Sequence, residues 1–224
     1  MGEYTAFFYG TLMAPGVLHR VIHGTHTPEK WQQDLITVRP AMLQHYRRHK
    51  VRHADYPAII PHKGSRVRGS VVTGLNEQDI RRLDIFEGSM YKRDVVKVQA
   101  LKDVALDQAA PEDEEKEPEV AEEVEAQTYV WLEDVEETLD PNEWDFAAFK
   151  RDKMRAWMGI EDDNSVEVDE GFADVDAAAA AWDEADQREK GPERNGTTKK
   201  GHDPMGGRGA NGHITRQLED ETLR

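Results

Sequence analysis

Glu87 is the residue whose sequence neighbours most directly suggest acid–base chemistry. Ile80 and Leu83 precede it by seven and four residues, so on a helix the three side chains share one stripe. The outward positions of that helix hold charged or amide side chains: Glu77, Gln78, Arg81 and Arg82. A carboxylate among apolar neighbours is well suited to general acid–base catalysis. The alternative is a glutamate at a helix end that turns into solvent.

A second candidate is the run Tyr9, Gly10, Thr11, Leu12, in which a short apolar strand runs into glycine and then a helix. Successive backbone N–H groups at such a turn can hold an anion. The plainer alternative is a tight strand-to-helix turn without a ligand. Tyr91 follows Glu87 by four residues, so we expect its hydroxyl near that carboxylate, unless it serves the core together with Tyr56.

The basic run at residues 45–53 holds three histidines, three arginines and a lysine. The histidines are spaced for one face of a helix, but the region reads as a strand and offers no carboxylate partner, so we expect no metal site. A solvated basic edge, a patch that holds acidic segments of the same chain, or a phosphate-binding patch remain as alternatives.

The elements that must position these residues form a mixed α/β pattern. Val, Ile and Thr between Gly and Pro predict strands at residues 5–9, 35–46, 58–61, 67–74, 91–101 and 126–132. Helices are expected from Pro15, over residues 76–86 with Asn76 as N-cap, and from Asp140 through Trp157 to a stop at Gly159.

Charge divides the 224 residues into unlike parts. The net charge is −16, yet residues 1–102 carry sixteen basic and nine acidic residues, a local +7. Residues 107–125 hold ten acids and few apolar residues, which predicts a disordered acidic insertion, taken as 103–125, within a domain of residues 4–159. Residues 160–224 are acidic and then Gly-rich. We expect a largely disordered tail there, in which residues 177–182 can form a short helix.

Several classes of protein are excluded by composition. The chain has no cysteine, which excludes disulfide scaffolds, cysteine proteases and thiolate zinc sites. No apolar run approaches the ~20 residues that span a bilayer, and the first residues lack the pattern of a signal peptide. We therefore expect a cytoplasmic protein.

Four motifs together resemble the AIG2-like branch of the gamma-glutamylcyclotransferase-like family. They are residues 7–12 (FFYGTL), 56–59 (YPAI), 69–72 (GSVV) and 83–93 (LDIFEGSMYKR). The resemblance covers residues 4–158 and implies a small barrel-like mixed α/β fold with flanking helices and its site at the barrel mouth.

The resemblance also implies an enzyme of the acyltransferase class. Such enzymes turn a γ-glutamyl amide into 5-oxoproline and a free amine, using the substrate's own α-amine as nucleophile and no cofactor or metal. Glu87 matches the family's catalytic glutamate, and Tyr9, Gly10, Thr11 and Leu12 match its binding loop. Tyr91 is expected to help shape the pocket.

The resemblance leaves the amine part of the substrate open: γ-glutamyl amino acids, glutathione-like peptides and γ-glutamyl amines all fit. A non-catalytic binding module, whose acidic tail recruits a protein partner, is the main alternative. A nucleic-acid binder using residues 45–53 ranks last, because a net charge of −16 opposes contact with phosphate.

Overall fold

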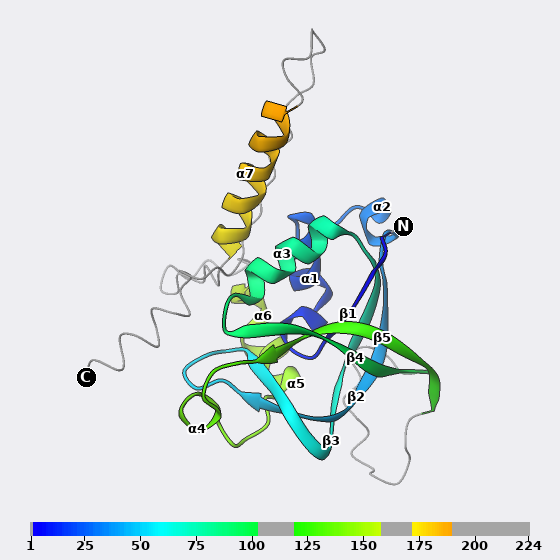
Figure 1. Ribbon diagram of the computed structural model, residues 1–224, viewed down its shortest axis with the longest axis vertical. Coiled ribbons are helices and arrows are strands. Elements are labelled where there is room, and N and C mark those ends of the chain that lie inside the picture. Colours follow the sequence, from blue (N-terminus) through cyan, green and yellow to red (C-terminus); the bar gives the residue numbers. More distant parts are fainter. Residues whose placement is uncertain (1, 103–118, 158–171, 190–224) are drawn as a thin grey trace, which may run out of the picture.

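A computed structural model describes residues 2–102, 119–157 and 172–189 and shows a closed five-stranded barrel with helices on one side (Figure 1). The strands follow one another around the barrel in the order β1, β3, β2, β4, β5. Neighbouring strands pair antiparallel except β1 and β5, which are parallel and paired only at Ala6 and Gln127. The strand bounds are β1 Tyr4–Phe8, β2 Thr37–Lys50, β3 Pro57–Leu75, β4 Tyr91–Leu101 and β5 Val120–Trp131.

The interior of the barrel is filled by small and branched side chains from all five strands. Phe7 of β1 lies there together with Leu43, Ile59, Val71, Val98, Ala126 and others of one buried cluster. Because side chains alternate along a strand, Phe8 points to the opposite side and joins a second cluster that the helices cover. The apolar run at the start of the chain is therefore buried on both faces.

Helices α1 and α3 pack against one outer face of the barrel, and the longer helix α7 extends away from it (Figure 1). Val17, Leu18, Val21 and Ile22 of α1, and Ile80, Leu83 and Phe86 of α3, supply most of the helical part of the second cluster. The helical bounds are η1 Thr11–Met13, α1 Pro15–His23, α2 Lys30–Gln33, α3 Glu77–Glu87, α4 Val135–Thr138, α5 Phe146–Asp152, α6 Met154–Trp157 and α7 Phe172–Glu189. None of the helices in the described part of the chain is long and apolar enough to cross a membrane.

Helix α3 begins after the predicted N-cap and ends at Glu87, one residue later than expected. The Asn76 side chain accepts hydrogen bonds from the N–H groups of Gln78 and Asp79, and the Asp79 carboxylate accepts one from the N–H of Asn76. This reciprocal capping box satisfies N–H groups that the first turn leaves without partners. The helix stops at Gly88, whose φ of 72° lies in the left-handed region. Glu87 is thereby its last residue.

Three barrel strands, β2, β3 and β5, are longer than the sequence predicted. The two strands expected at residues 58–61 and 67–74 are one strand, β3, and β2 runs on to Lys50. A β-bulge at His45, with φ of 65°, shifts the register between β2 and β3. Residues 120–125, expected within the disordered insertion, extend β5, because Val124 reaches the barrel interior while the alternating acids face solvent. Residues 103–118 lie outside the described residues.

The helix expected from Asp140 was placed too early. It begins at Phe146, where the Asp145 carboxylate accepts hydrogen bonds from the N–H groups of Ala147 and Ala148. The Asp140 carboxylate instead accepts one from the N–H of Asn142 within a turn. The pattern at residues 140–143 thus marks a local turn rather than a helix start.

Part of the segment expected to be a largely disordered tail forms helix α7, longer than the short helix expected at residues 177–182. Its first residue, Phe172, packs on Phe86 of α3 with ring centroids 5.5 Å apart, and Arg20 of α1 forms an ion pair with Asp176 at 3.5 Å. The helix is longer than expected because buried apolar residues, among them Phe172 and Val175, lie between its acidic residues, and the average composition of the segment does not reveal them. Residues 158–171, including Gly159, and 190–224 lie outside the described residues, and the domain bounds stay predictions.

Candidate active site

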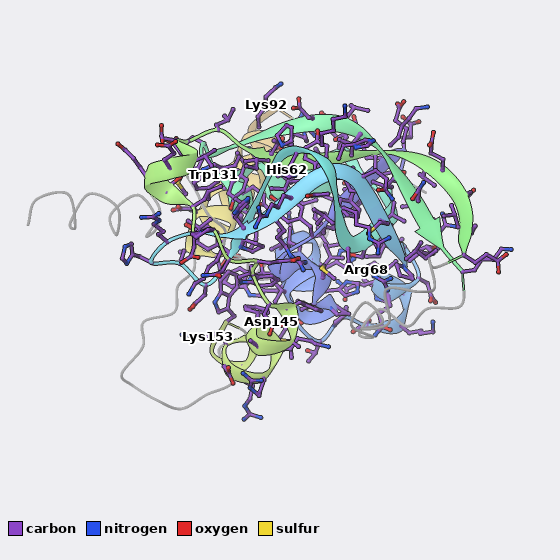
Figure 2. All side chains as sticks on the ribbon, turned by 90° about the horizontal axis from the view of Figure 1, so that it is seen from below. His62, Arg68, Lys92, Trp131, Asp145 and Lys153 are labelled. Atoms are coloured by element: carbon purple, nitrogen blue, oxygen red, sulfur yellow. The ribbon has the colours of Figure 1, made fainter. Side chains whose placement is uncertain are left out.

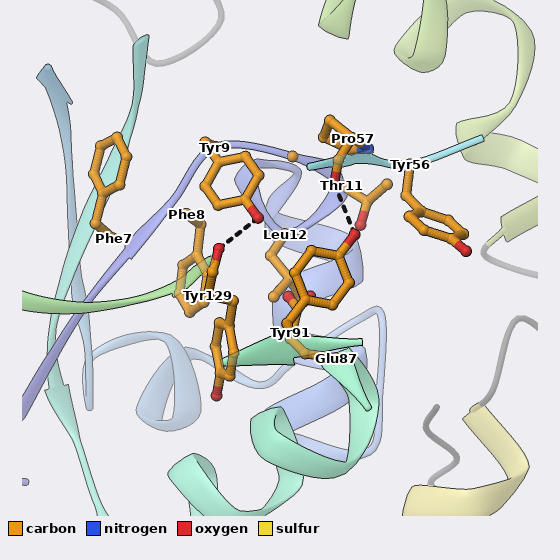
Figure 3. Close-up of a pocket in the computed structure, with 11 residues that line it drawn as sticks. Phe7, Phe8, Tyr9, Thr11, Leu12, Tyr56, Pro57, Glu87, Tyr91 and Tyr129 are labelled. Carbon is orange, nitrogen blue, oxygen red and sulfur yellow. Dashed lines mark hydrogen bonds between the residues drawn. The ribbon is translucent and has the colours of Figure 1, made fainter. Parts of the chain in front are cut away.

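One pocket brings together all six residues singled out as catalytic or substrate-binding from the sequence (Figure 3). It lies where β1 ends and where β3 and β4 begin, beside the end of α3, and encloses about 310 Å³, including space open to solvent at its mouth. Its lining is Phe7, Phe8, Tyr9, Gly10, Thr11, Leu12, Tyr56, Pro57, Glu87, Tyr91 and Tyr129. Residues up to 122 positions apart in the chain thus share one small, largely aromatic cavity.

The turn at residues 9–12 has no room for a side chain at Gly10, because Pro57 lies against it. A Cβ atom at Gly10 would stand 2.7 Å from Cγ and 2.9 Å from Cδ of Pro57, so only glycine fits there without displacement. The turn leads into η1, whose first backbone N–H groups, at Thr11 and Leu12, have no acceptor among the described residues. These N–H groups are therefore available to an oxygen atom of a ligand.

Two tyrosine hydroxyls fix the pocket walls. The hydroxyl of Tyr9 donates to the carbonyl of Tyr129 at 2.6 Å, and that of Tyr91 donates to the carbonyl of Pro57 at 2.9 Å (Figure 3). The bond of Tyr91 joins β4 to the start of β3, and the bond of Tyr9 joins the turn after β1 to β5. The hydroxyl of Tyr91 was expected near Glu87. The hydroxyl of Tyr91 donates to Pro57 and so holds the start of β3 against β4 at the pocket wall.

Glu87 reaches the pocket from the last turn of α3 and is partly buried, on the same side as buried Ile80 and Leu83. One turn earlier on the helix, the Asp84 carboxylate accepts a hydrogen bond from the hydroxyl of Tyr129 at 2.9 Å. Burial, followed by the charges of Asp84 and Glu87, raises the pKa of Tyr129 well above its ordinary value. Tyr129 therefore remains a neutral donor, and Glu87 supplies the carboxyl group of the pocket lining.

The basic run at residues 45–53 is used mainly within the chain. Arg47 donates to the carbonyl of Pro141, Arg52 to that of Leu139, and a ring nitrogen of His49 lies 2.9 Å from the carbonyl oxygen of Asp140. Backbone bonds from Lys50 and Arg52 add to this attachment. The run thus fastens residues 138–142, which contain a single acid, to β2 through backbone groups, and the expectation that it holds acidic segments of the same chain stays a prediction.

A second hollow of about 630 Å³ lies between the end of β2 and α5. Asp145 and Lys153, both labelled in Figure 2, belong to its lining. Most of its charged side chains are paired: Lys153 with Asp55 at 3.3 Å, Glu143 with Arg48 at 2.8 Å and Asp152 with Arg151 at 2.7 Å. Asp145 caps α5. Fewer polar groups of this hollow are therefore available to a ligand than in the pocket of Glu87.

No group of three or more His, Asp or Glu side chains within the described ranges is arranged to hold a metal ion. His49 is engaged by Asp140, and His45 stands at the bulge of β2 with its side chain exposed. The three histidines of the basic run are therefore not gathered into one ligand set.

Tyr129 is the pocket residue that the sequence did not reveal. It stands in an ordinary strand pattern, and only the parallel contact between β1 and β5 brings it beside Tyr9. Tyr56 and Pro57 were recognisable from their motif, and both line the cavity.

Comparisons with known proteins agree on one group. A sequence model described as "Gamma-glutamyl cyclotransferase, AIG2-like" matches residues 6–146. Protein AIG2 C of Arabidopsis thaliana is 27% identical over 148 residues, which cover 66% of this chain and 73% of that protein. AIG2-like protein B of the same plant is 27% identical over 158 residues, covering 69% and 74%. A solution structure of an Arabidopsis thaliana protein is similar with a TM-score of 0.42 and 25% identity, covering 70% of this chain and 86% of that one.

Proposed function

Because the chain belongs to the AIG2-like gamma-glutamyl cyclotransferase family, we propose that it releases 5-oxoproline and a free amine from γ-glutamyl amides. The single observation that carries the proposal is the meeting of Glu87 with the turn at residues 9–12 in one pocket. A carboxylate and unpaired backbone N–H groups are the two kinds of group that this reaction needs.

The reaction requires proton transfer in both directions. The substrate's α-amine attacks its own γ-carbonyl carbon, a C–N bond forms, and the former amide C–N bond breaks. Glu87 accepts the proton lost by the attacking amine and returns it to the departing amine. The group must act first as a base and then as an acid, which one carboxyl group can do when it stays beside the reacting atoms.

The remaining lining residues support the same step. The N–H groups of Thr11 and Leu12 are placed to donate to a substrate oxygen, and such donors stabilise negative charge that develops during attack. The aromatic walls, held by the hydroxyl bonds of Tyr9 and Tyr91, give a fixed cavity that favours a curled substrate. Since ring closure is intramolecular, holding that conformation supplies much of the acceleration.

The test is release of 5-oxoproline from a panel of γ-glutamyl amino acids, peptides and amines by the wild type and by Glu87→Gln. The amide of Gln keeps the size of the side chain but cannot exchange the proton, so we expect release to fall by at least about 10²-fold. Glu77→Gln, an exposed change on the same helix, is the matched control and should keep wild-type release.

Equal release by wild type and Glu87→Gln would contradict the assignment of Glu87. No release from any member of the panel by the folded wild type would contradict the proposed reaction itself. The non-catalytic binding module would then be the better description.

A further inference from the structure

Arg48 is a buried cation that contacts the turn at residues 9–12 without lining the pocket. It lies on β2, its side chain is 10% exposed, and it is absent from the lining of the pocket. One guanidinium nitrogen, Nη1, donates to the carbonyl of Tyr9 at 3.0 Å and to that of Arg68 at 3.4 Å. The other, Nη2, donates to the Glu143 carboxylate at 2.8 Å.

The position of Arg48 is fixed from several sides. Its guanidinium carbon lies 5.7 Å from the centre of the Trp144 ring, and Trp144 in turn donates to the carbonyl of Asp55 at 2.9 Å. Burial lowers the pKa of Arg48, and the charge of Glu143 opposes that change, so the group keeps its proton. Arg52, an exposed residue of the same run, differs from Arg48, because its guanidinium donates to the carbonyl of Leu139.

The hydrogen bond from Arg48 to the carbonyl of Tyr9 fixes the orientation of the peptide group that also contains the N–H of Gly10. The carbonyl of Tyr9 and the N–H of Gly10 belong to one peptide group, and the described chain contains no cis peptide bond. In a planar trans peptide the two point in opposite directions. Holding the carbonyl on the side of Arg48 therefore directs the N–H of Gly10 to the other side, where Gly10 lines the pocket.

We infer that Arg48 is a positioning residue that aims and polarises the Gly10 N–H toward the substrate. The inference rests on the proposed function, because it adds the N–H of Gly10 to those of Thr11 and Leu12 as a donor to a substrate oxygen. A charged donor on the carbonyl withdraws electron density from the peptide and makes its N–H a stronger donor. The guanidinium acts through the backbone and does not touch the substrate.

The test compares Arg48→Gln with Arg52→Gln in the full chain. Both changes remove a cation of the same strand region that binds a carbonyl, but only the first loses the contact with Tyr9. We expect Arg48→Gln to lower kcat/KM for 5-oxoproline release by about 10- to 100-fold, less than complete loss of an oxyanion donor costs. Arg52→Gln should stay within about twofold of wild type, and Arg48→Lys, which keeps one charged donor, should recover part of the loss.

The backbone amide signal of Gly10 in a ¹H–¹⁵N spectrum supplies a measurement that does not depend on turnover. It should move in Arg48→Gln and stay in place in Arg52→Gln. A fall in kcat/KM no larger than that of Arg52→Gln, or an unmoved Gly10 signal, would overturn the inference.

Failure of the proposed function is separable from failure of this inference. If the wild type releases no 5-oxoproline, the Gly10 signal alone decides the role of Arg48. If Arg48→Gln does not fold, Arg48→Lys and Arg52→Lys take the places of the two Gln variants. A larger change of the Gly10 signal in Arg48→Lys supports the inference, and equal changes overturn it.

Discussion

Gly10 shows how much of the pocket depends on single atoms. Its φ of −128° is open to any residue, so the requirement for glycine comes from space and not from backbone strain. Pro57, whose carbonyl also accepts the hydroxyl of Tyr91, stands against it. The same proline therefore sets both the width of the turn and the place of a tyrosine wall.

Gly10→Ala should displace Pro57 and with it the mouth of the pocket. We expect a loss of about 1–3 kcal/mol in the free energy of unfolding from overpacking, and at least a tenfold fall in kcat/KM. Urea denaturation and 5-oxoproline release measure the two effects. Gly64→Ala is the control: with φ of 87° and open space around its Cβ position, it should lose stability but keep activity. Equal activity of the two variants would contradict the argument.

His19 should make stability depend on pH. It is 8% exposed in α1, stacks on His23 with ring centroids 5.2 Å apart, and burial together with His23 lowers its pKa from 6.5 to about 4. Between these values the unfolded chain takes up a proton that the folded chain does not, so stability falls as pH falls through this window. The slope contributed by His19 is about 1.4 kcal/mol per pH unit.

Urea denaturation between pH 6.5 and 5 tests this assignment. His19→Gln should have a flatter dependence than wild type by about that slope, while His26→Gln, at an exposed position, should follow the wild type. Parallel dependences of His19→Gln and wild type would show that His19 does not carry the effect.

Helix α3 links local sequence to the candidate site. Its capping box stands at one end and Glu87 at the other, so the cap fixes where the helix begins and the 3.6-residue repeat then sets the direction of Glu87. The placement of Glu87 was predictable because both signals are local. A cap is also a feature whose loss affects stability without touching the pocket.

Asn76→Ala should lower the free energy of unfolding by about 1 kcal/mol, because the N–H groups of Gln78 and Asp79 lose their acceptor. Urea denaturation measures the loss, and kcat/KM should remain within about twofold because Glu87 lies eleven residues away, at the other end of the helix. Gln78→Ala, an exposed change two residues further along in the first turn, is the control and should cost less. No difference between the two variants would contradict the role of the cap.

Elements were predictable where their determinants are near in sequence. Strand β4 was placed at its observed bounds, and α1 at its observed start, from alternation and from Pro15. The continuity of β3 and the extension of β5 were not, because both depend on pairing with β2 and β4 across the sheet. The roles of Tyr129 and Arg48 were missed for the same reason: their partners lie 120 and 39 residues away.

At the scale of the molecule, α7 is attached to the barrel domain by a few apolar side chains. Phe172 and Val175 are 6% and 0% exposed, and Phe172 packs on Phe86, the residue before Glu87. The matched family region, residues 6–146, ends before this helix. The helix therefore contributes to the core of the domain from outside the family's shared segment.

Phe172→Ala should lower the free energy of unfolding by about 3 kcal/mol through the cavity left beside Phe86. Urea denaturation of the full chain measures this loss. Ala180→Ser, at an exposed position of α7, is the control and should change stability by less than about 0.5 kcal/mol. A loss below about 1 kcal/mol for Phe172→Ala would indicate that α7 rests only weakly on the domain.

The closure of the barrel has a consequence for the order of folding. β1 and β5 meet at one paired position, reinforced by bonds from Thr128 to the carbonyl of Phe7 and from Tyr9 to the carbonyl of Tyr129. These contacts join residues about 120 apart in the chain. Because closing so long a loop costs conformational entropy, we expect them to form last during folding. During synthesis the pocket is not complete until Tyr129 has left the ribosome, and a nascent chain that stops earlier contains Glu87 without the pocket around it.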